Sequence, residues 1–285
     1  MQTFLTSHQE ILACLMPFVH ACLWLALMAV IFVPLEHVFA VRPAKLFNKG
    51  WSTNLGWYFV NSLVTVFLLG PPTALIALII HLLIPESVTA MAASLPLWGR
   101  MTAAMVVGEI GFYWGHRWSH EIPLLWRFHA IHHSARHINF LVNTRAHPVD
   151  LVFTRLCGLL LLQACGLASA VGGHPTLVPA LVLFIGSLWS FFIHANVRWR
   201  LGPFEELIAS PAFHHWHHTL DDHNDHNFAP MLPFMDRLFG TFYLPKIWPS
   251  AYGINTPMPE ALIDQLLEPF SGRSKVAAPR TMSES

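Results

Sequence analysis

The stretch HRWSHEIPLLWRFHAIHH, from His116 to His133, holds two groups of closely spaced histidines. Its first group has the spacing HxxxH and its second the spacing HxxHH, and another HxxHH follows at residues 214–218. Of the 19 histidines in the chain, seven lie in residues 116–147 and seven in residues 194–226. The rest of the sequence is mostly apolar, so we expect it to hold these three clusters together at a membrane surface.

The composition indicates an integral membrane protein. Of the 285 residues, 54% are hydrophobic and 11% are charged, whereas soluble domains carry about 25% charged residues. The formal net charge is zero, so the charge balance does not favour nucleic acid as a partner. The four cysteines lie in apolar runs without a CxxC pair, which is typical of reduced core or lipid-facing residues rather than of a disulfide framework. They are Cys14, Cys22, Cys157 and Cys165.

Five apolar segments predict an all-α fold, an integral membrane helical bundle. They are residues 11–33, 55–84, 95–114, 156–171 and 177–193. No basic residue precedes the first, which indicates a retained anchor rather than a cleaved signal peptide, and Pro34 and Glu36 are expected to end it. Gly70-Pro71-Pro72 interrupts the second, which is either one kinked crossing or a re-entrant hairpin. Gly172-Gly173-His174-Pro175 predicts a tight turn between the last two, both of which are short for a full crossing.

The basic residues favour a crossing at 55–84. If each segment crosses once and the N-terminus lies outside, all of the 16 Lys and Arg residues except Arg100 fall on the inner side. Cytoplasmic loops prefer Lys and Arg in this way, and a hairpin at 55–84 would destroy the asymmetry. We therefore expect a multi-pass protein with a histidine-rich di-metal cap on the cytoplasmic side.

The chain divides into three regions. Residues 1–94 hold the first membrane segments, residues 95–245 hold all three histidine clusters, and residues 246–285 form a C-terminal extension. The tail from Ser271 is polar, with Gly, Pro and Ser, and is expected to be disordered.

The spacing of the clusters predicts a metal site. Residues i, i+3 and i+4 share a helix face, so each cluster can aim two or three imidazoles at one point. Eight imidazoles exceed the ligands that one ion takes and suit two ions held close together. They are His116, His120, His129, His132, His133, His214, His217 and His218.

The choice of metal depends on the surroundings of these histidines. Imidazole suits Zn, Cu, Fe and Ni, and without a cysteine cluster or an HExxH motif neither a zinc finger nor a zinc protease is indicated. A site above an apolar bundle suits a lipid substrate, and an unreactive C–H bond needs a redox metal and O2. We therefore predict iron, and the residues alone leave zinc open.

Three carboxylates near the clusters are candidates for a role at the site. Glu121 directly follows the first cluster and is a candidate ligand or catalytic base. Glu109 lies seven residues before His116, about two turns deeper on the same helix face, and an ionisable residue in a membrane segment is a functional candidate. Asp150 is a candidate partner for the second ring nitrogen of a ligand histidine.

The remaining histidines stand alone. His20, His37 and His81 are expected to be structural or interfacial. The sequence assigns no role to five other histidines, namely His137, His174, His215, His223 and His226.

The three spacings, in this order and among membrane segments, resemble the fatty acid hydroxylase and sterol desaturase superfamily of membrane di-iron oxygenases. Further motifs within residues 95–245 are similar to that family, namely YWGHR at 113–117, RAHP at 145–148, FIHAN at 192–196, SPAFH at 210–214, NF at 227–228 and DRLFGT at 236–241. Met235 departs from the usual Trp, and Ala229-Pro230 stands where Gly is usual. Both departures lie outside the clusters and bear on the substrate more than on the metal chemistry.

The resemblance implies an activity and a ligand set. The eight clustered histidines would bind two Fe ions, and His147 and His194 would be added ligands or would hold ligands in place. The irons would use O2 to hydroxylate or desaturate a lipid of sterol, fatty acyl or alkylglycerol type. The HRxxHE form with Glu121 is most similar to the alkylglycerol monooxygenase branch, which implies a tetrahydropterin reductant, and a separate electron-transfer protein is the other possible donor.

Two other classes are less consistent with the sequence. A metal transporter or sensor would spread ionisable residues through several membrane segments, whereas here they gather in the clusters. A membrane haem protein would place single histidines on facing segments, such as His20 and His81, and would leave the clusters unexplained.

Overall fold

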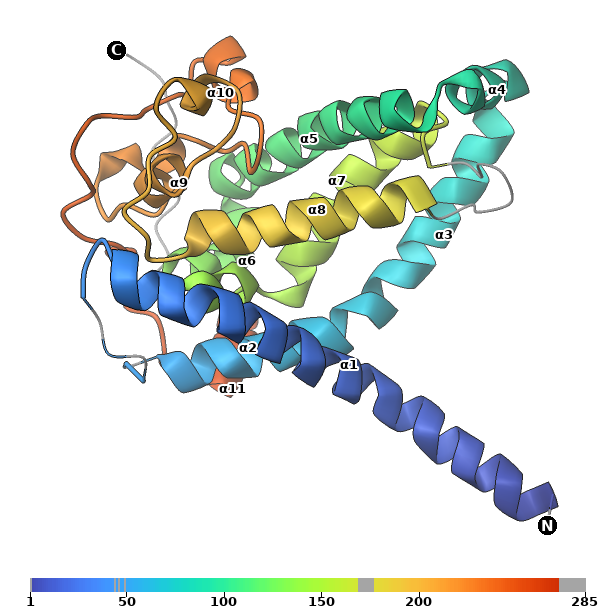
Figure 1. Cartoon of the computed structure of the whole chain (residues 1–285), viewed down its shortest axis with the longest axis horizontal. Helices are drawn as coiled ribbons and strands as arrows, with labels where there is room; N and C mark the ends of the chain where they lie inside the picture. Colours follow the sequence, from blue (N-terminus) through green and yellow to red (C-terminus); the bar gives the residue numbers. More distant parts are fainter. Residues whose placement is uncertain (1, 44, 46, 49, 169–176, 272–285) are drawn as a thin grey trace.

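The computed structural model describes residues 2–43, 45, 47, 48, 50–168 and 177–271, and over these residues the protein is helical (Figure 1). The predicted all-α class is confirmed. The only strand-like pairing in these ranges is an isolated antiparallel bridge between Thr219 and Tyr252. The predicted turn at 172–175 and the tail beyond Ser271 lie outside the described residues.

Long helices form a bundle, and short helices cover one end of it. The long helices are α1 (Gln2–Phe39), α2 (Trp51–Leu63), α3 (Thr65–Leu83), α5 (Leu97–Glu121), α6 (Pro123–His133), α7 (Pro148–Ala164) and α8 (Leu177–His194). The short elements are α4 (Glu86–Ser94), η1 (Phe140–Thr144), η2 (Gly202–Glu206), α9 (Pro211–His217), η3 (Asp222–Asp225), α10 (Phe234–Leu238), α11 (Leu262–Leu267) and η4 (Glu268–Phe270). Figure 1 shows α9 and α10 at one end of α5 and α8, α4 at the other end, and the first half of α1 projecting from the bundle.

Two helices are long and apolar enough to cross a membrane, namely α1 over Leu15–Phe39 and α8 over its whole length. The pair α2 and α3 qualifies only as one span, with a bend of 41° at the junction, which fits a broken crossing or a re-entrant loop. Among the described helices, α5 and α7 do not qualify by length and composition. These two helices pack chiefly on each other, and the two ionisable residues in the apolar part of α5, Arg100 and Glu109, are buried within the protein.

The predicted end of the first helix is wrong. α1 continues through Pro34 and Glu36 to Phe39. The Glu36 carboxylate accepts the backbone N–H groups of Phe140, at 2.7 Å, and Asn196, at 3.0 Å. A proline removes one helical hydrogen bond and can kink a helix without ending it. Glutamate is a good helix former, and the two backbone N–H groups give its buried carboxylate hydrogen-bond partners.

The predicted break at Gly70-Pro71-Pro72 is also wrong. These residues lie inside α3, and the chain changes direction at Val64 instead. Prolines are tolerated within membrane helices when small local adjustments satisfy the freed carbonyl groups. The sequence shows the prolines, but the position of the bend depends on how α2 and α3 pack on the rest of the bundle.

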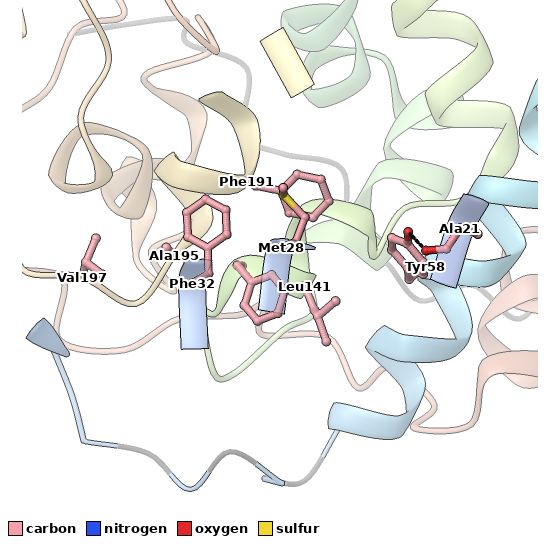
Figure 2. Close-up of a cluster of buried hydrophobic side chains, with 9 residues drawn as sticks. Ala21, Met28, Phe32, Tyr58, Leu141, Phe191, Ala195 and Val197 are labelled. Atoms are coloured by element: carbon pink, nitrogen blue, oxygen red, sulfur yellow. Dashed lines mark hydrogen bonds between the residues drawn. The ribbon is translucent and has the colours of Figure 1, made fainter. Parts of the chain in front are cut away.

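An apolar core fastens the second half of α1 to the bundle (Figure 2). Its buried side chains come from α1, α2, η1, α8 and the segment after α8. Tyr58 on α2 donates its hydroxyl hydrogen to the carbonyl oxygen of Ala21 on α1, at 2.6 Å (Figure 2). The cluster contains Ala21, Met28, Phe32, Tyr58, Phe140, Leu141, Phe191, Ala195 and Val197.

The segment after residue 245 packs on the bundle rather than apart from it. Trp57 on α2 donates its indole N–H to the side-chain oxygen of Gln265 on α11, at 2.7 Å. Thr53 on α2 donates its hydroxyl hydrogen to the carbonyl oxygen of Glu260, also at 2.7 Å. These bonds hold α11 against α2.

Glycines let α5 and α7 approach closely. A Cβ atom at Gly111 would lie 2.4 Å from the carbonyl oxygen of Cys157 and 2.7 Å from the Cα atom of Gly158. Small residues allow this approach of helix backbones in membrane proteins. The crossing positions the metal centre described below, because α5 carries His116 and α7 carries Asp150.

We expect Gly111→Ala to lower the free energy of unfolding by about 1–3 kcal/mol, because the added methyl group overpacks the crossing. Gly70→Ala is the matched control, since a Cβ atom there meets nothing within 4 Å. Thermal unfolding in detergent measures both variants, and only Gly111→Ala should unfold at a lower temperature. An unchanged Tm for Gly111→Ala would contradict the close crossing.

Candidate metal centre

Nine buried histidines converge in two groups where α5, α6, α8 and α9 meet. Within each group the ligand nitrogens lie within 4.8 Å of one another, and none of the nine side chains is more than 6% exposed. The five-histidine group contains His116, His120, His129, His133 and His217. The four-histidine group contains His132, His194, His214 and His218. The eight clustered histidines are thus brought together, and His194 joins them.

Each HxxHH motif divides its histidines between the two groups, which corrects the expectation that one cluster aims at one point. An α-helix turns by about 100° per residue, so positions i and i+4 lie about 40° apart, whereas i+3 and i+4 lie about 100° apart. In α6, His129 and His133 share the five-histidine group and His132 turns to the other group. In α9, His214 belongs to the four-histidine group and His217 turns away from it. One short helix can therefore serve two ions.

The distances between ring nitrogens fit metal coordination. Neighbouring Nε2 atoms lie 3.1–3.2 Å apart in the five-histidine group and 2.9–3.2 Å apart in the four-histidine group. Two nitrogens bound at right angles to one ion, each at about 2.1 Å, would be about 3.0 Å apart. The donor set and its spacing therefore fit two transition-metal ions.

The second ring nitrogen, Nδ1, of six of these histidines faces an oxygen. The Nδ1 atom of His116 lies 2.7 Å from the carbonyl oxygen of Phe228, and that of His129 lies 2.9 Å from the Asp150 carboxylate. The other four pairs are His120 with Asp225, His132 with the Arg145 carbonyl, His194 with the Ser190 carbonyl and His217 with the His226 carbonyl. Because these oxygens accept, Nδ1 carries the hydrogen and Nε2 is left free to bind a metal.

One unpaired ring nitrogen also points to a metal. The buried Nε2 atom of His217 has no hydrogen-bond partner among the described residues, although its Nδ1 atom is bonded. Burial of an imidazole nitrogen without a partner is unfavourable. A metal ion in the five-histidine group would supply the missing partner.

Burial keeps the imidazoles neutral. Burial, together with the neighbouring His129 imidazole, lowers the pKa of His116 to about 3. Burial likewise holds the pKa values of His133, His217 and His218 well below the ordinary value of 6.5. These four rings are therefore uncharged at neutral pH, which is the form that binds metal.

Helix starts set the orientation of the ligands. Pro123 is the first residue of α6 and Pro211 is the first residue of α9. The hydroxyl oxygen of Ser210 accepts the backbone N–H of Phe213 at 3.2 Å, so it caps α9 in the way that favours a helix start. The two HxxHH motifs thus lie at the ends of α6 and α9, two helices whose beginnings are specified locally.

Two aspartates hold ligand rings in place. Asp150, at the start of α7, accepts from His129 and also from the Ser119 hydroxyl, at 3.2 Å, which confirms the predicted pairing with a ligand histidine. Asp225, in η3, accepts from the Nδ1 atom of His120 at 2.9 Å. Sequence reasoning missed Asp225, because it lies 105 positions from its partner, and the acidic run at 221–225 was the only local signal.

The DRLFGT motif acts on the site through the backbone. The Asp236 carboxylate accepts the N–H groups of Phe228, at 2.7 Å, and Ala229, at 2.9 Å, and the hydroxyl hydrogen of Thr241, at 2.7 Å. The carbonyl oxygen of Phe228 in turn accepts from His116. The motif therefore fixes the loop that orients one ligand, and Ala229 contributes only its backbone N–H there.

The structure places Glu121 outside both groups. Its carboxylate accepts from the Nε atom of Arg117 at 2.7 Å, and its side chain is 41% exposed. Because it follows His120 by one residue, it points about 100° away from that ligand around the helix. This placement does not support a role as ligand or base.

His147 also lies outside both groups. Its Nδ1 atom accepts the backbone N–H of Val149 at 3.1 Å, and its Nε2 atom donates to the carbonyl oxygen of Leu266 at 3.2 Å. Both ring nitrogens are engaged, so the expectation that His147 binds a metal or holds a ligand is corrected. The HP motif instead starts α7 and thereby brings Asp150 to the five-histidine group.

Glu109 is buried on α5, on the side that faces the loop before α10. Its carboxylate accepts the backbone N–H groups of Met231, at 2.8 Å, and Leu232, at 2.7 Å. It bonds no histidine. Its predicted catalytic role stays a prediction, and its contacts are those of a residue that positions the 231–232 segment.

The unassigned histidines lie outside the two groups where the structure describes them. His215 is buried in α9 but bonds the Tyr252 hydroxyl and the Ala195 carbonyl oxygen. His137 is exposed, and the His223 ring stacks on Tyr243. The backbone carbonyl oxygen of His226 accepts from the Nδ1 atom of His217. His174 lies outside the described residues.

A cavity of about 660 Å³ reaches both groups. Side chains from α1, α2, α5, α7 and α8 line it, including Ala21, Tyr58 and Phe191 of the core in Figure 2. Five ligand histidines also line it, namely His116, His129, His132, His194 and His214. Its volume falls within the range of about 300–1,000 Å³ that is typical of small-molecule sites.

Comparison with known proteins agrees with this geometry. Residues 101–241 match the model of the fatty acid hydroxylase family. The ornithine lipid hydroxylase OlsE of Rhizobium tropici is 34% identical over 184 residues, which cover 63% of this chain and 53% of OlsE. The alkylglycerol monooxygenase of Danio rerio is 30% identical over 155 residues, which cover 53% of this chain and 32% of that protein. Methylsterol monooxygenase 2-2 of Arabidopsis thaliana is 28% identical over 163 residues, which cover 52% of this chain and 55% of that protein.

The chain thus spans about half the length, or less, of these curated relatives. No solved structure matches it at a significant level. The family match contains all nine histidines and the carboxylates of Asp150, Asp225 and Asp236. Residues 101–241 are therefore a fatty acid hydroxylase domain, and this domain contains both histidine groups.

Proposed function

We propose that this protein is a membrane-bound oxygenase that uses O2 to hydroxylate or desaturate a lipid. The observation that carries the proposal is the cavity of about 660 Å³, whose lining includes histidines of both groups. A lipid chain held there would lie against both candidate metal sites. The relatives are lipid hydroxylases and monooxygenases by name, which supports the same class of reaction.

The metals that we propose are two iron ions, one in each histidine group. An all-imidazole donor set suits iron, zinc, copper and nickel. Zinc has no redox chemistry, whereas oxidation of a C–H bond by O2 requires a redox-active metal. When bound, the iron pair would supply the O2 activation that removes hydrogen from the lipid.

The protein side chains would orient the ligands and keep water out. Asp150 and Asp225 accept the Nδ1 hydrogens of His129 and His120, which directs the Nε2 atoms of these rings to the ion. The mostly apolar cavity wall would exclude water from the reacting carbon. Glu109 would act indirectly, by holding the 231–232 segment that lines the cavity.

The proposed arrangement in the membrane follows the apolar helices. α1, α8 and the bent pair α2–α3 would cross the bilayer, and α5 and α7 would be two further crossings that other helices cover. With these five crossings, the distribution of Lys and Arg would put the histidine groups on the cytoplasmic side. Residues 1–94 would serve as the membrane anchor, residues 95–245 as the catalytic domain and residues 246–285 as an extension whose α11 supports α2. A lipid would then enter the cavity from the bilayer between the helices that line it.

Reducing equivalents would come from a separate donor. Oxidation of a lipid by O2 needs two electrons besides those of the substrate. A tetrahydropterin or an electron-transfer protein would supply them, and titration of each donor against lipid oxidation would identify which one works.

Iron content and lipid oxidation together test the proposal. The detergent-purified protein is loaded with iron, reduced, and incubated with isotopically labelled O2 and a sterol, a fatty acid or an alkylglycerol. Mass spectrometry should show one labelled oxygen in the product of a hydroxylase, or the loss of two hydrogens without label for a desaturase. Failure of the iron-loaded protein to oxidise any of the three lipids would contradict the proposal.

Filling the cavity should abolish much of the activity without loss of metal. Gly186 lines the cavity and a Cβ atom there meets nothing within 4 Å, so Gly186→Phe would place its ring in the space for the lipid. We expect kcat/KM to fall about tenfold or more, which corresponds to about 1.4 kcal/mol. Gly70→Phe is the control, because Gly70 also has open space around it but does not line the cavity. Equal activity of the two variants would show that the lipid binds elsewhere.

A further inference from the structure

One arginine lines the cavity. Arg155, on α7, is the only Lys or Arg among the described residues that form its wall. It is partly buried, and it shares a stripe of α7 with Leu151, Gly158 and Leu162, which also line the cavity. A guanidinium group thus stands in an otherwise apolar row of side chains.

The acidic residues of the cavity are engaged by other partners. The wall has two carboxylates, Glu109 and Asp150. Glu109 accepts two backbone N–H groups, and Asp150 accepts from His129 and Ser119. No ion pair or hydrogen bond joins either carboxylate, or any other described residue, to the Arg155 guanidinium.

An unpaired cation in an apolar cavity has a physical cost. Removal of a charge from water is unfavourable unless an opposite charge or hydrogen-bond acceptors replace the water. An arginine is always protonated, so it does not escape this cost by losing a proton. A ligand that brings its own anionic oxygens into the cavity would compensate for the charge.

We propose that Arg155 binds an anionic group, a carboxylate or a phosphate, of the lipid inside the cavity. The planar guanidinium forms paired hydrogen bonds with either group. The inference rests on the proposed function for the identity of the ligand as a lipid, and it adds the chemistry of the polar end of that lipid.

The position of Arg155 connects this site with the metal centre. Arg155 lies five residues after Asp150, about 7.5 Å further along the helix axis. Asp150 contacts His129, which also lines the cavity. One lipid molecule can therefore contact Arg155 with its anionic group and reach the histidine groups with a nearby part of its chain.

Equilibrium binding of three lipids with the same palmitoyl chain tests the proposal. The probes are palmitic acid, palmitoyl lysophosphatidic acid and neutral monopalmitoylglycerol, and native mass spectrometry of the metal-loaded, unreduced protein gives their Kd values. Arg155→Gln should weaken one or both anionic lipids by about tenfold or more, the ratio expected for loss of a charge-assisted hydrogen bond. The neutral lipid should change by less than about twofold, because it makes no such bond. Arg155→Lys keeps the charge and should restore part of the lost affinity.

The pattern among the probes identifies the anion. Weaker binding of palmitic acid alone assigns a carboxylate, weaker binding of the lysophosphatidic acid alone assigns a phosphate, and weaker binding of both assigns a site for either. Arg127→Gln is the matched control, since Arg127 is an exposed residue of α6 that does not line the cavity. Unchanged affinities in Arg155→Gln, or an equal loss for all three lipids, would overturn the proposal.

This test separates the site from the reaction. Binding is measured without reductant, so it requires no turnover. If the anion preference depends on Arg155 but no lipid is oxidised, the proposed function fails and the binding site stands. If lipids are oxidised and Arg155→Gln binds all three as the wild type does, the binding site fails and the function stands.

Discussion

His133→Ala is expected to remove the metal ion of the five-histidine group and to leave that of the four-histidine group, whereas His132→Ala should do the reverse. These neighbouring residues belong to different groups because they are turned about 100° apart on α6. Metal content should fall from two ions per chain to one in each variant. Lipid oxidation should fall by more than about a hundredfold, because even residues that only orient a metal ligand typically account for 10–100-fold.

Two controls separate metal binding from the loss of a histidine as such. His215→Ala removes a fully buried histidine of α9 that belongs to neither group, and His223→Ala removes one that packs on Tyr243 near the surface. Both should retain two ions per folded chain in elemental analysis. If His132→Ala and His133→Ala each lose both ions, the two groups form one joint site, and the assignment of separate ions is wrong.

Asp150→Asn is expected to weaken metal binding in the five-histidine group by about 10–100-fold. The carboxylate of Asp150 is buried and accepts from His129 at 2.9 Å. Asparagine is nearly the same size as aspartate but has no charge, so His129 would offer less electron density to the ion. The amide N–H of asparagine also cannot accept the Nδ1 hydrogen of His129, so the ring would be held less firmly. The loss should appear in chelator competition as faster and easier removal of one of the two ions.

Asp221→Asn is the matched control for this second variant. Asp221 also pairs with a histidine, His223, at 3.0 Å, but that pair is solvent-exposed and outside both groups. Exposed pairs contribute about 0–1 kcal/mol, so metal affinity should not change. Wild-type affinity in Asp150→Asn would show that the carboxylate does not tune the ligand.

Most of the donor set was predictable because it depends on local spacing. The recurrence of HxxxH and HxxHH identified eight of the nine clustered histidines, because positions i and i+4 of a helix lie on the same side. The same local reasoning failed for His147 and Glu121. The side chain of His147 caps α7, and the side chain of Glu121 bonds Arg117 instead of facing either histidine group.

Long-range contacts were not predictable in this way. Asp225, the Phe228 carbonyl and the Arg145 carbonyl reach their histidines only because loops far apart in the chain fold over α5 and α6. Likewise, the backbone donors to the Glu36 carboxylate, Phe140 and Asn196, lie 104 and 160 positions further along the chain. No periodicity in the sequence marks these partners.

The sequence by itself determined the helical class, the apolar segments and the identity of eight of the nine clustered histidines, because these follow from composition and from the repeat of an α-helix. Only the tertiary structure decided how the histidines divide between two groups and which oxygens orient them. It also decided where the chain bends at Val64 and that a cavity joins Arg155 to the metal centre. These features depend on the packing of helices that are distant in sequence, and packing distances are not encoded in local spacing.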